Sequence, residues 1–393
     1  MIEFAGLKLR NPFVVASSPL TAKPHLLQKA EEFGAAGASV KLTFIKQPFL
    51  GKCRMYNNPK EGSIVCHDRR LDLEEGQRVI SEARKLTKDL ILFSNITHAA
   101  EDLDGWVYLA KTMQDAGAHA IEANMICPNL SMTAKRLGQE GPSGGGTAGQ
   151  HPEMAAAITR ALKESVSIPV IVKLTPNVTD ITEIAKACED GGADGVCMAG
   201  GQLSLPPMDI YHPENIYPLL EGASLGSLGG PASRLLGFAM VASAFRRISI
   251  PIIGGGGLEK WEHAVQYMMW GSTLVTACTV IMWRGFEVIP KIIEKLDQFI
   301  QKQGYSEYKD LVGRSAHTLR AAEHLSTIAG APTVDPERCN GCGVCLKPGH
   351  CEAIYLKDGL ASVWAEKCMG CSICIALCPR KALAFKPLVR AWP

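Results

Sequence analysis

The stretch PVIVKLTPNVTDITEIAKACEDGGADGVCMAG, residues 169–200, contains one complete unit of the fold. Short apolar runs at 169–174 and 195–200 flank a segment, 180–192, in which apolar residues recur every three or four positions until a glycine pair ends the pattern. The flanking runs are almost continuously hydrophobic, as strands buried on both faces are, and the middle segment has the period of an amphipathic helix. The stretch therefore predicts a strand–helix–strand unit with parallel strands.

The same alternation recurs along the first three hundred residues. Further apolar, β-rich runs lie at 13–18, 38–43, 90–95, 120–125, 251–256 and 274–279, with amphipathic segments such as 104–117 and 151–166 between them. Eight strands that alternate with helices predict the α/β class and a (β/α)8 TIM barrel, which we expect to occupy residues 1–310. A doubly wound sheet is the alternative, but it rarely needs eight such units, and no G-x-G-x-x-G follows the first run.

A second pattern is the cluster of cysteines near the C-terminus. Of 14 cysteines, eight lie between Cys339 and Cys378, and the run CMGCSICIALCP has the C-x2-C-x2-C-x3-C-P spacing of bacterial ferredoxins. We therefore expect residues 335–393 to form a small ferredoxin-like domain with two [4Fe–4S] clusters, joined to the barrel by a helical linker at 311–334. In such domains the fourth cysteine of each run serves the other cluster. The expected ligands are Cys339, Cys342, Cys345 and Cys378 for one cluster and Cys351, Cys368, Cys371 and Cys374 for the other.

The first cysteine run, which begins CNGCGVC, departs from the ferredoxin pattern at its end. Five residues separate Cys345 from Cys351, and Glu352 follows Cys351 where the second run has Pro379. This spacing loosens the loop around one cluster but still supplies an eighth thiolate. A zinc ribbon is the alternative, since paired C-x2-C also binds zinc.

Composition and charge limit the location and the partners. The formal net charge is +2 at pH 7, which gives no reason to expect nucleic acid or an acidic membrane surface as a partner. Residues 1–13 carry charges within their apolar run and no small-residue cleavage site, and no uncharged apolar run reaches about 18 residues. Clustered cysteines without an export signal indicate a cytoplasmic protein.

In a (β/α)8 barrel the functional residues follow the carboxyl ends of the strands. Glycine and Cys-Thr pairs after the last two runs suit backbone N–H groups that bind a phosphate. Lys41 and Lys173 lie in buried runs, which is costly unless each meets an anion or an electron-rich ring, or extends its ammonium to solvent. A phosphate site with paired lysines, in a chain with iron–sulfur cysteines, suggests FMN, which links one-electron to hydride chemistry. The strand-end positions are Ser17, Lys41, Asn95, Asn124, Lys173, Gly200, Gly256, Gly257, Cys278 and Thr279.

Several of these segments resemble the dihydroorotate dehydrogenase family. They are NPFVVASSP (11–19), SVKLT (39–43), N-x-x-C-P-N (124–129), KLTPNVTDI (173–181), GGADGV (191–196) and the glycine run at 254–257. The similarity covers essentially the whole chain and is greater to the pyrimidine-reducing half of dihydropyrimidine dehydrogenases, in which a ferredoxin domain closes the chain. It implies that Cys127 is the general acid/base and that Lys41 and Lys173 lie beside the flavin. It also implies FMN contacts from Ala16, Ser17, Lys41, Asn124, Lys173, Gly230, Gly256, Gly257, Cys278 and Thr279.

A catalytic role and a structural one compete for Cys127. Hydride addition to a polarised C=C bond leaves a carbon that needs a proton from the opposite face, and a cysteine on a mobile loop can supply it. Residues 135–149, rich in glycine and poor in apolar anchors, are predicted to be that loop. Packing is the alternative, and it is the expected role of the remaining barrel cysteines, Cys53, Cys66, Cys188, Cys197 and Cys278.

The polar residues by which pyrimidine-handling relatives hold the ring are only partly present. Gly200 and Gly201 stand where Asn-Thr is expected, Ala100 replaces an asparagine and Ile126 a serine, whereas Asn124 and Asn129 remain. A site that lacks these partners recognises ring amides poorly, so we expect a conjugated substrate, cyclic or anionic, that need not be uracil or thymine. Candidate anion-binding residues are His67, Arg69 and Arg70, and His98 is a further candidate; exposed, solvated side chains are the alternative for all four.

Electrons must reach this chain from outside it, because it has no dinucleotide fingerprint. The resemblance implies a partner subunit that oxidises NAD(P)H and carries FAD and iron–sulfur clusters, or else a free ferredoxin, in a hetero-oligomer that can itself dimerise. The expected activity is FMN-dependent reduction, or formation, of a C=C bond. Three alternatives stay open: a true dihydropyrimidine dehydrogenase subunit for uracil and thymine, a dihydroorotate dehydrogenase, and an electron-transfer subunit with a purely structural barrel.

Overall fold

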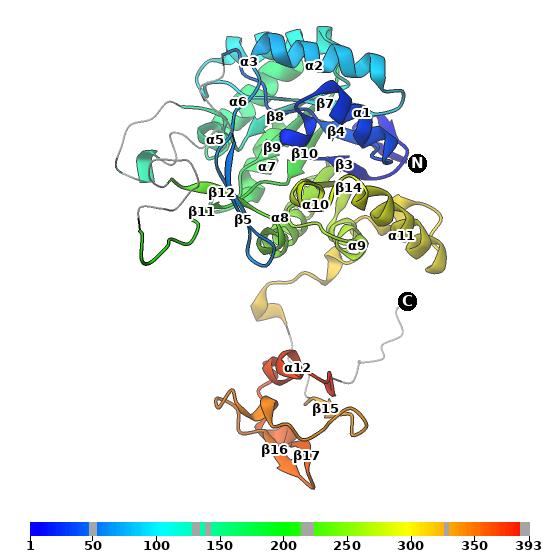
Figure 1. Ribbon diagram of the computed structural model, residues 1–393. Helices are drawn as coiled ribbons and strands as arrows, with labels where there is room; N and C mark the ends of the chain where they lie inside the picture. The colour runs from blue at the N-terminus through cyan, green and yellow to red at the C-terminus, as the bar shows by residue number, and fades with distance from the viewer. Residues whose placement is uncertain are drawn as a thin grey trace. The chain divides into compact units, whose positions relative to one another are not determined.

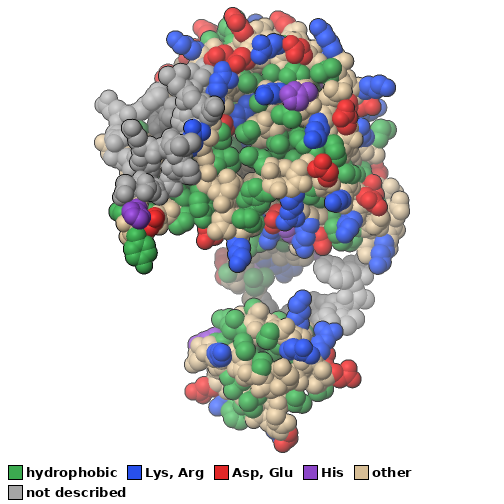
Figure 2. Space-filling model, viewed as in Figure 1, with side chains coloured by type: hydrophobic (Ala, Val, Ile, Leu, Met, Phe, Trp, Pro, Cys, Tyr) green, Lys and Arg blue, Asp and Glu red, His purple; other side chains and the backbone are tan. Residues whose placement is uncertain are grey.

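The computed structural model describes residues 1–46, 53–127, 134–136, 138, 143–213, 224–325 and 330–385. The chain forms two compact units, Met1–Leu319 and Arg320–Pro393 (Figure 1). Basic and acidic side chains are interspersed over the face of the first unit that Figure 2 shows, in keeping with the small net charge of the chain. In the described residues, no helix is long and apolar enough to cross a membrane.

The first unit is built on a closed barrel of eight parallel strands, which confirms the predicted fold class. The order around the barrel is β10-β13-β14-β3-β4-β7-β8-β9, and helices cover its outside (Figure 1). The strands are β3 (Phe13–Val15), β4 (Gly37–Ser39), β7 (Ile91–Ile96), β8 (Ala120–Met125), β9 (Val170–Leu174), β10 (Gly195–Met198), β13 (Ile252–Gly255) and β14 (Ser272–Ala277). The helices that follow them are α1 (Pro24–Glu32), α2 (Leu73–Leu86), α3 (Leu103–Asp115), α6 (Pro152–Ser165), α7 (Ile181–Asp190), α8 (Arg234–Phe245), α9 (Trp261–Trp270) and α11 (Val288–Lys302).

The stretch at 169–200 forms the predicted unit, β9–α7–β10. Asp180 begins the helix, because its carboxylate accepts the backbone N–H of Thr182 at 2.8 Å and satisfies a donor that the first turn leaves free. The helix ends at Gly191, and its buried face, which includes Ile184 and Cys188, packs onto the barrel. Strand β10 then pairs in parallel with β9.

A hairpin closes the amino end of the barrel. Strands β1 (Ile2–Phe4) and β2 (Leu7–Leu9) pair across a turn at Ala5 and Gly6, both of which have positive φ. Phe4 packs edge-on against Phe93 of β7, with ring centroids 6.4 Å apart. The carboxyl end of the barrel is therefore the end left open for a site.

A four-stranded antiparallel sheet covers that carboxyl end, and the sequence patterns do not predict it. Its order is β11-β12-β6-β5, and it combines the segments that follow β4 and β10. The Trp283 indole N–H donates to the Asn57 side-chain oxygen at 3.0 Å, which ties this sheet to the turn of helix after β14. The strands are β5 (Arg54–Asn58), β6 (Gly62–His67), β11 (Leu203–Ser204) and β12 (Gly226–Gly229), and we call them the cover sheet.

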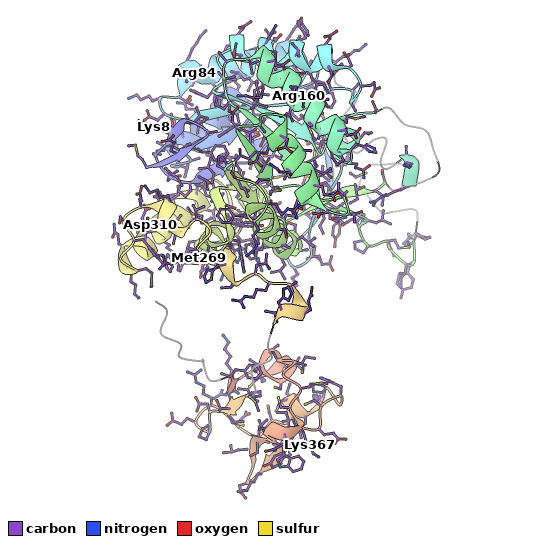
Figure 3. All side chains as sticks on the ribbon, turned by 180° about the vertical axis from the view of Figure 1, so that it is seen from behind. Lys8, Arg84, Arg160, Met269, Asp310 and Lys367 are labelled. Carbon is purple, nitrogen blue, oxygen red and sulfur yellow. The ribbon has the colours of Figure 1, made fainter. Side chains whose placement is uncertain are left out.

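The linker predicted to be helical at 311–334 contains short 3-10 turns, and its described residues form no α-helix. The start of this linker bonds to the barrel instead: the N–H groups of Gly313 and Ser315 donate to the carbonyls of Met268 and Met269 at the end of α9. Met269 is labelled in Figure 3. The Arg246 guanidinium also binds the Ala316 carbonyl at 3.1 Å.

The second unit has a small core and little regular structure. Its described residues contain two antiparallel strand pairs and one short α-helix around a core of Cys345, Ala361 and Leu383. The strands are β15 (Thr333–Val334), β16 (Ile354–Lys357), β17 (Leu360–Val363) and β18 (Leu383–Ala384), and the helix is α12 (Ile373–Leu377).

Candidate active site

A cavity of about 260 Å³ lies between the carboxyl ends of the barrel strands and the cover sheet. Every FMN contact predicted from the resemblance lines this cavity, and so does Cys127. Residues that are far apart in the chain meet here because parallel strands all end at one rim. The predicted residues that line it are Ala16, Ser17, Lys41, Asn124, Cys127, Lys173, Gly230, Gly256, Gly257, Cys278 and Thr279, together with Arg70 from the candidate anion site.

One side of the cavity is a cradle of glycine backbone. Gly230, Gly256 and Gly257 all have positive φ, which L side chains rarely adopt, and a Cβ on Gly257 would lie 2.6 Å from the Gly230 carbonyl oxygen. The hydroxyl of Ser63, on β6, lines the same cavity, is buried and has no hydrogen-bond partner among the residues that the structure describes. Close backbone approach and an unpartnered buried hydroxyl fit a bound group rich in oxygen acceptors, such as a phosphate.

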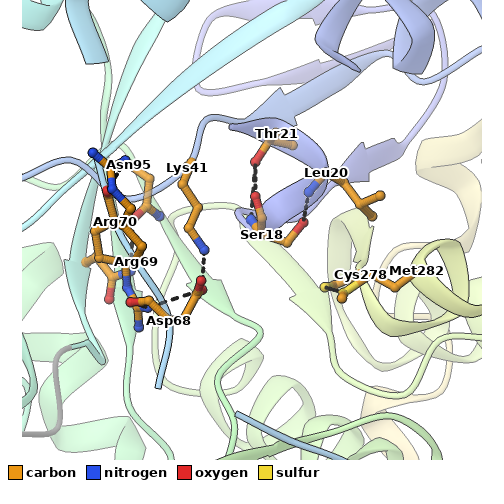
Figure 4. A network of polar contacts seen from close by, with 11 residues as sticks. Ser18, Leu20, Thr21, Lys41, Asp68, Arg69, Arg70, Asn95, Cys278 and Met282 are labelled. Atoms are coloured by element: carbon orange, nitrogen blue, oxygen red, sulfur yellow. Dashed lines mark hydrogen bonds and ion pairs between the residues drawn. The ribbon is translucent and has the colours of Figure 1, made fainter. Parts of the chain in front are cut away.

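Lys41 reaches into the cavity from the loop after β4 and shares a carboxylate with Arg70 (Figure 4). Its ammonium forms an ion pair with Asp68, and the Arg70 guanidinium lies 3.1 Å from the same Asp68 oxygen. Burial lowers the pKa of Lys41, Asp68 offsets part of this effect, and Arg70 lowers the pKa further. Two basic side chains therefore share the carboxylate of Asp68 in this part of the cavity.

A short turn holds the loop that carries Ser17 beside Lys41. The Ser18 hydroxyl accepts the N–H of Leu20 at 3.2 Å, and the Thr21 hydroxyl donates to the Ser18 carbonyl at 3.1 Å (Figure 4). The N–H of Lys41 donates to the Thr21 carbonyl, so the same turn also fixes the backbone of the lysine.

Lys173, at the end of β9, is the second buried lysine of the cavity. Its register partner on β8 is Asn124, and its ammonium lies 3.7 Å from the carboxylate of Glu122 on the same strand. Burial is the largest influence and lowers the pKa of Lys173, but Glu122 and the nearby cysteines together outweigh burial, so the pKa lies above its ordinary value. The ammonium is therefore retained inside the barrel.

Cys127 lies half-buried at the cavity wall, directly after β8. Its backbone N–H donates to the side-chain oxygen of Asn124 at 2.9 Å. Of the loop predicted to be mobile at 135–149, the last part is a short buried helix, α5 (Gly145–Ala148), that packs against β8. A Cβ on Gly145 would lie 2.0 Å from the Asn124 carbonyl oxygen, so this contact needs glycine.

The candidate anion-binding residues separate into different environments. Arg70 lines the cavity, whereas the exposed guanidinium of Arg69 binds both oxygens of Glu75 at 2.9 Å. His98 binds Asp102 at 2.7 Å at the start of α3 and does not line the cavity. The structure therefore brings neither Arg69 nor His98 to the site. Asn129 and the side chain of His67 lie outside the described residues.

Sequence reasoning missed four residues of this region. Ser63 and Ser227 lie on strands of the cover sheet that were not predicted, so they had no signal. Asp68 could have been found from the sequence, because it is an acidic residue directly before the two arginines Arg69 and Arg70. Glu122 could also have been found, since a carboxylate inside the apolar run 120–125 must find a partner.

In the second unit, two small cavities each contain one predicted quartet of cysteines. One, of about 10 Å³, is lined by Cys339, Cys342, Cys345 and Cys378. The other, of about 20 Å³, is lined by Cys351, Cys368, Cys371 and Cys374, and Cys345 and His350 also border it. In the described residues no three side chains converge on a single metal ion. The thiolates of a cubane each bind a different iron, so they need no such convergence.

A closed parallel barrel with a polar, cationic site at the carboxyl ends of its strands defines the chain as a (β/α)8-barrel enzyme. Residues 1–300 match the family described as dihydroorotate dehydrogenase. The chain therefore belongs to the dihydroorotate dehydrogenase family and is an oxidoreductase that acts on CH–CH groups.

Similar proteins carry two different names. The NAD-dependent dihydropyrimidine dehydrogenase subunit PreA of Escherichia coli (strain K12) is 28% identical over 355 residues, which cover 88% of this chain and 84% of that protein. The catalytic subunit of dihydroorotate dehydrogenase B (NAD(+)) of Pyrococcus abyssi is 30% identical over 315 residues, 79% of this chain and 97% of that protein. The same subunit of Bacillus pumilus is 34% identical over 237 residues, 60% of this chain and 70% of that protein. A match over 88% of the chain extends beyond the barrel unit, which ends at Leu319.

Proposed function

We propose that this chain is the catalytic subunit of an FMN-dependent oxidoreductase that reduces, or forms, a polarised C=C bond in a conjugated, anionic substrate. The observation that carries the proposal is the cavity that brings Lys41, Lys173, Asn124 and Cys127 together with a glycine cradle. Electrons would come from a partner through two [4Fe–4S] clusters of the second unit.

The residues of the cavity suit FMN. Gly230, Gly256 and Gly257, with the unpartnered Ser63 hydroxyl, would hold the phosphate through backbone and hydroxyl donors. Lys41 and Lys173 would supply positive charge to the ring. When bound, FMN supplies the conversion between single electrons and a hydride.

Cys127 is the proposed proton donor for the reduction and acceptor for the reverse reaction. Its thiol lies in the cavity wall, and its backbone is held through Asn124, so its position is fixed at the end of β8. A group that moves a proton in the transition state contributes by being held within hydrogen-bond reach of the reacting atom.

The substrate is proposed to be an anion because Arg70 lines the cavity beside Lys41, and both cations contact the carboxylate of Asp68. A guanidinium so placed can bind a carboxylate through parallel hydrogen bonds. Ile126 lines the same cavity where the pyrimidine-handling relatives are expected to have a serine, which disfavours ring amides.

The two cysteine quartets are the proposed ligands of the clusters. Their grouping in the second unit supports the ferredoxin-type pairing, in which Cys378 and Cys351 each serve the cluster of the other run. The electron donor is proposed to be an NAD(P)H-oxidising subunit with FAD and iron–sulfur clusters, in a hetero-oligomer, and a free ferredoxin is the second choice. Two of the similar proteins are named as a subunit of an NAD-dependent enzyme.

Two related activities are the competing proposals, uracil or thymine reduction and dihydroorotate oxidation, because similar proteins bear both names. A test begins with chain purified without oxygen, in which FMN and iron are assayed. The flavin is then reduced and mixed with uracil, thymine, orotate and a panel of conjugated carboxylic acids. Reoxidation by conjugated acids at rates well above those of uracil and thymine is expected. A chain that binds no flavin, or that prefers uracil and thymine, contradicts the proposal.

A further inference from the structure

A chain of hydrogen bonds runs from a buried carboxylate inside the barrel to the backbone of Cys127. Glu122 is 2% exposed, and its carboxylate accepts the side-chain amide of Asn95 on β7. The Asn95 oxygen accepts the amide of Asn124 at 2.9 Å. The Asn124 oxygen then accepts two backbone N–H groups, of Ile126 and Cys127, each at 2.9 Å. Residues from β7 and β8 thus connect the barrel interior to the wall of the cavity.

Only one orientation of the two asparagine amides satisfies this chain. Backbone N–H groups can only donate, so the Asn124 oxygen must face Ile126 and Cys127. A carboxylate can only accept, so the Asn95 amide nitrogen must face Glu122. Both ends demand the same direction, and the chain is self-consistent. The Ser39 hydroxyl, on β4, also donates to the Glu122 oxygen that accepts from Asn95.

The same carboxylate is the counter-ion of Lys173. The Lys173 side chain is 8% exposed, and its ammonium lies 3.7 Å from the Glu122 carboxylate. The other titratable groups that face it are the thiols of Cys127, Cys197 and Cys278. Burial raises the pKa of Cys197 and of Cys278, so these two thiols remain uncharged. Glu122 is the one carboxylate among the described groups that face Lys173.

We propose that Glu122 is a positioning residue with two separable roles: through Asn95 and Asn124 it anchors the backbone that carries Cys127, and it is the counter-ion that holds the positive charge of Lys173 in the cavity. The first role stands on hydrogen bonds alone. The second rests on the proposed function, because its consequence is the charge presented to a bound flavin.

Two substitutions separate these roles. Asn95→Leu keeps the approximate volume and the Glu122–Lys173 pair but cuts the chain of hydrogen bonds. Glu122→Gln removes the charge, while its amide oxygen can still accept from Asn95. Asp194→Asn is the matched control, because Asp194 also accepts a lysine, Lys163 at 2.6 Å, but at the opposite end of β9.

The first measurement is hydrogen exchange of the full chain, followed at the amides of Ile126 and Cys127. Asn95→Leu is expected to speed their exchange at least about tenfold, since the acceptor that protects them is no longer held. Glu122→Gln and Asp194→Asn are expected to change it much less. Unchanged exchange in Asn95→Leu overturns the anchoring role, and this result does not depend on flavin.

The second measurement is the dissociation constant of sulfite for the flavin-loaded chain across pH. Sulfite adds reversibly to flavins and leaves negative charge on the ring, so its affinity reports a cation beside the ring. In wild type the affinity is expected to persist into alkaline solution. In Glu122→Gln, Lys173 is buried without a counter-ion, which lowers its pKa. The affinity for sulfite is therefore expected to fall, by at least about tenfold, at a lower pH than in wild type. If the sulfite affinity of Glu122→Gln depends on pH in the same way as that of Asp194→Asn, the counter-ion role is overturned.

If Glu122→Gln does not fold, a double variant still tests the counter-ion role. Leaving Lys173 buried without a partner is destabilising, whereas removing both charges is not. The double variant Lys173→Met with Glu122→Gln is therefore expected to fold where the single variant does not, and its failure contradicts the counter-ion role. Wild-type chain that binds no FMN instead contradicts the proposed function and leaves the exchange measurement valid.

Discussion

The hydroxyl of Ser227 occupies the space where a side chain on residue 201 would begin. A Cβ added to Gly201 would lie 2.1 Å from Ser227 Oγ and 2.5 Å from the Leu228 carbonyl oxygen. The glycine at the end of β10 thus lets the cover sheet close onto the barrel, and a hydroxyl from β12 lines the cavity in place of a side chain from residue 201. The glycine that stands at position 201 in place of the expected threonine therefore leaves no cavity, because Ser227 and the backbone of β12 fill the space.

Restoring the threonine at position 201 alone is expected to damage the fold. Gly201→Thr forces the new side chain into Ser227 and the β12 backbone, which overpacks the site and costs about 1–3 kcal/mol of unfolding free energy. Adding Ser227→Gly removes the nearer clash and is expected to recover part of that loss. Urea unfolding of the two variants measures the effect. A fully stable Gly201→Thr protein would show that the cover sheet moves freely.

The shared carboxylate Asp68 makes a pH-dependent prediction. Asp68→Asn leaves Lys41 and Arg70 buried together without their counter-ion and is expected to cost about 3 kcal/mol of unfolding free energy near pH 6. Removing Asp68 lowers the pKa of Lys41 further below its ordinary value, so the variant loses that proton at a lower pH than wild type. In this window the folded variant binds fewer protons than folded wild type, and its deficit shrinks as pH rises.

Urea unfolding of wild type and Asp68→Asn at pH 6 and pH 9 tests this pH dependence. The loss of unfolding free energy in the variant is expected to be smaller at pH 9 but not zero, because Arg70 remains charged. A deficit that grows with pH would mean that Lys41 is not the group that responds.

Arg70 and its neighbour Arg69 form a matched pair for testing the anion site. Arg70→Met is expected to raise KM for a conjugated carboxylate about 100-fold with a smaller change in kcat, because a charged hydrogen-bonding partner of the substrate is lost. Arg69→Met is expected to leave both constants near wild type, since Arg69 is exposed and paired with Glu75. Steady-state kinetics decides between them. Equal effects from the two variants would remove Arg70 from the substrate site.

The proposed cluster pairing predicts how iron is lost. Purified wild type is expected to hold about eight iron atoms per chain. Cys378→Ser is expected to remove or weaken the cluster that Cys339, Cys342 and Cys345 would hold and to leave the other cluster spectroscopically intact. Cys351→Ser is expected to do the reverse.

Iron analysis with electron paramagnetic resonance of the reduced chain distinguishes the two clusters. Cys188→Ala, in the barrel core, serves as the control and is expected to keep both. Loss of both clusters in each ligand variant would be inconsistent with independent sites, and zinc in place of iron would favour the ribbon alternative.

The barrel could be predicted from sequence because its signal is local and repeated. Each strand is a short apolar run and each helix has its own periodicity, as in 169–200, so tertiary contacts were not needed to recognise them. Lys41, Lys173 and Cys127 could be singled out for a related reason: parallel strands end at one rim, so position in the pattern implies position in the site.

The cover sheet could not be predicted in this way. Polar residues interrupt the apolar pattern in β5 (RMYNN) and β6 (GSIVCH). Strand β11 has only two residues, and β12, with the sequence GSLG, shows no alternation of polar and apolar residues. These strands exist because distant segments pair with one another, which no local pattern records. The positions of Ser63 and Ser227, and the separation of Arg70 from Arg69, depend on that pairing and therefore appear only in the structure.

The proton-donor role of Cys127 is tested most directly by following one turnover of the reduced flavin in wild type and in Cys127→Ala. Both proteins are reduced without oxygen and mixed rapidly with the conjugated acid that reoxidises wild type fastest. Equal FMN content and at least about 100-fold slower reoxidation are expected in Cys127→Ala, because the substrate carbon opposite the hydride has lost its proton donor. Equal reoxidation rates in the two proteins would contradict this role.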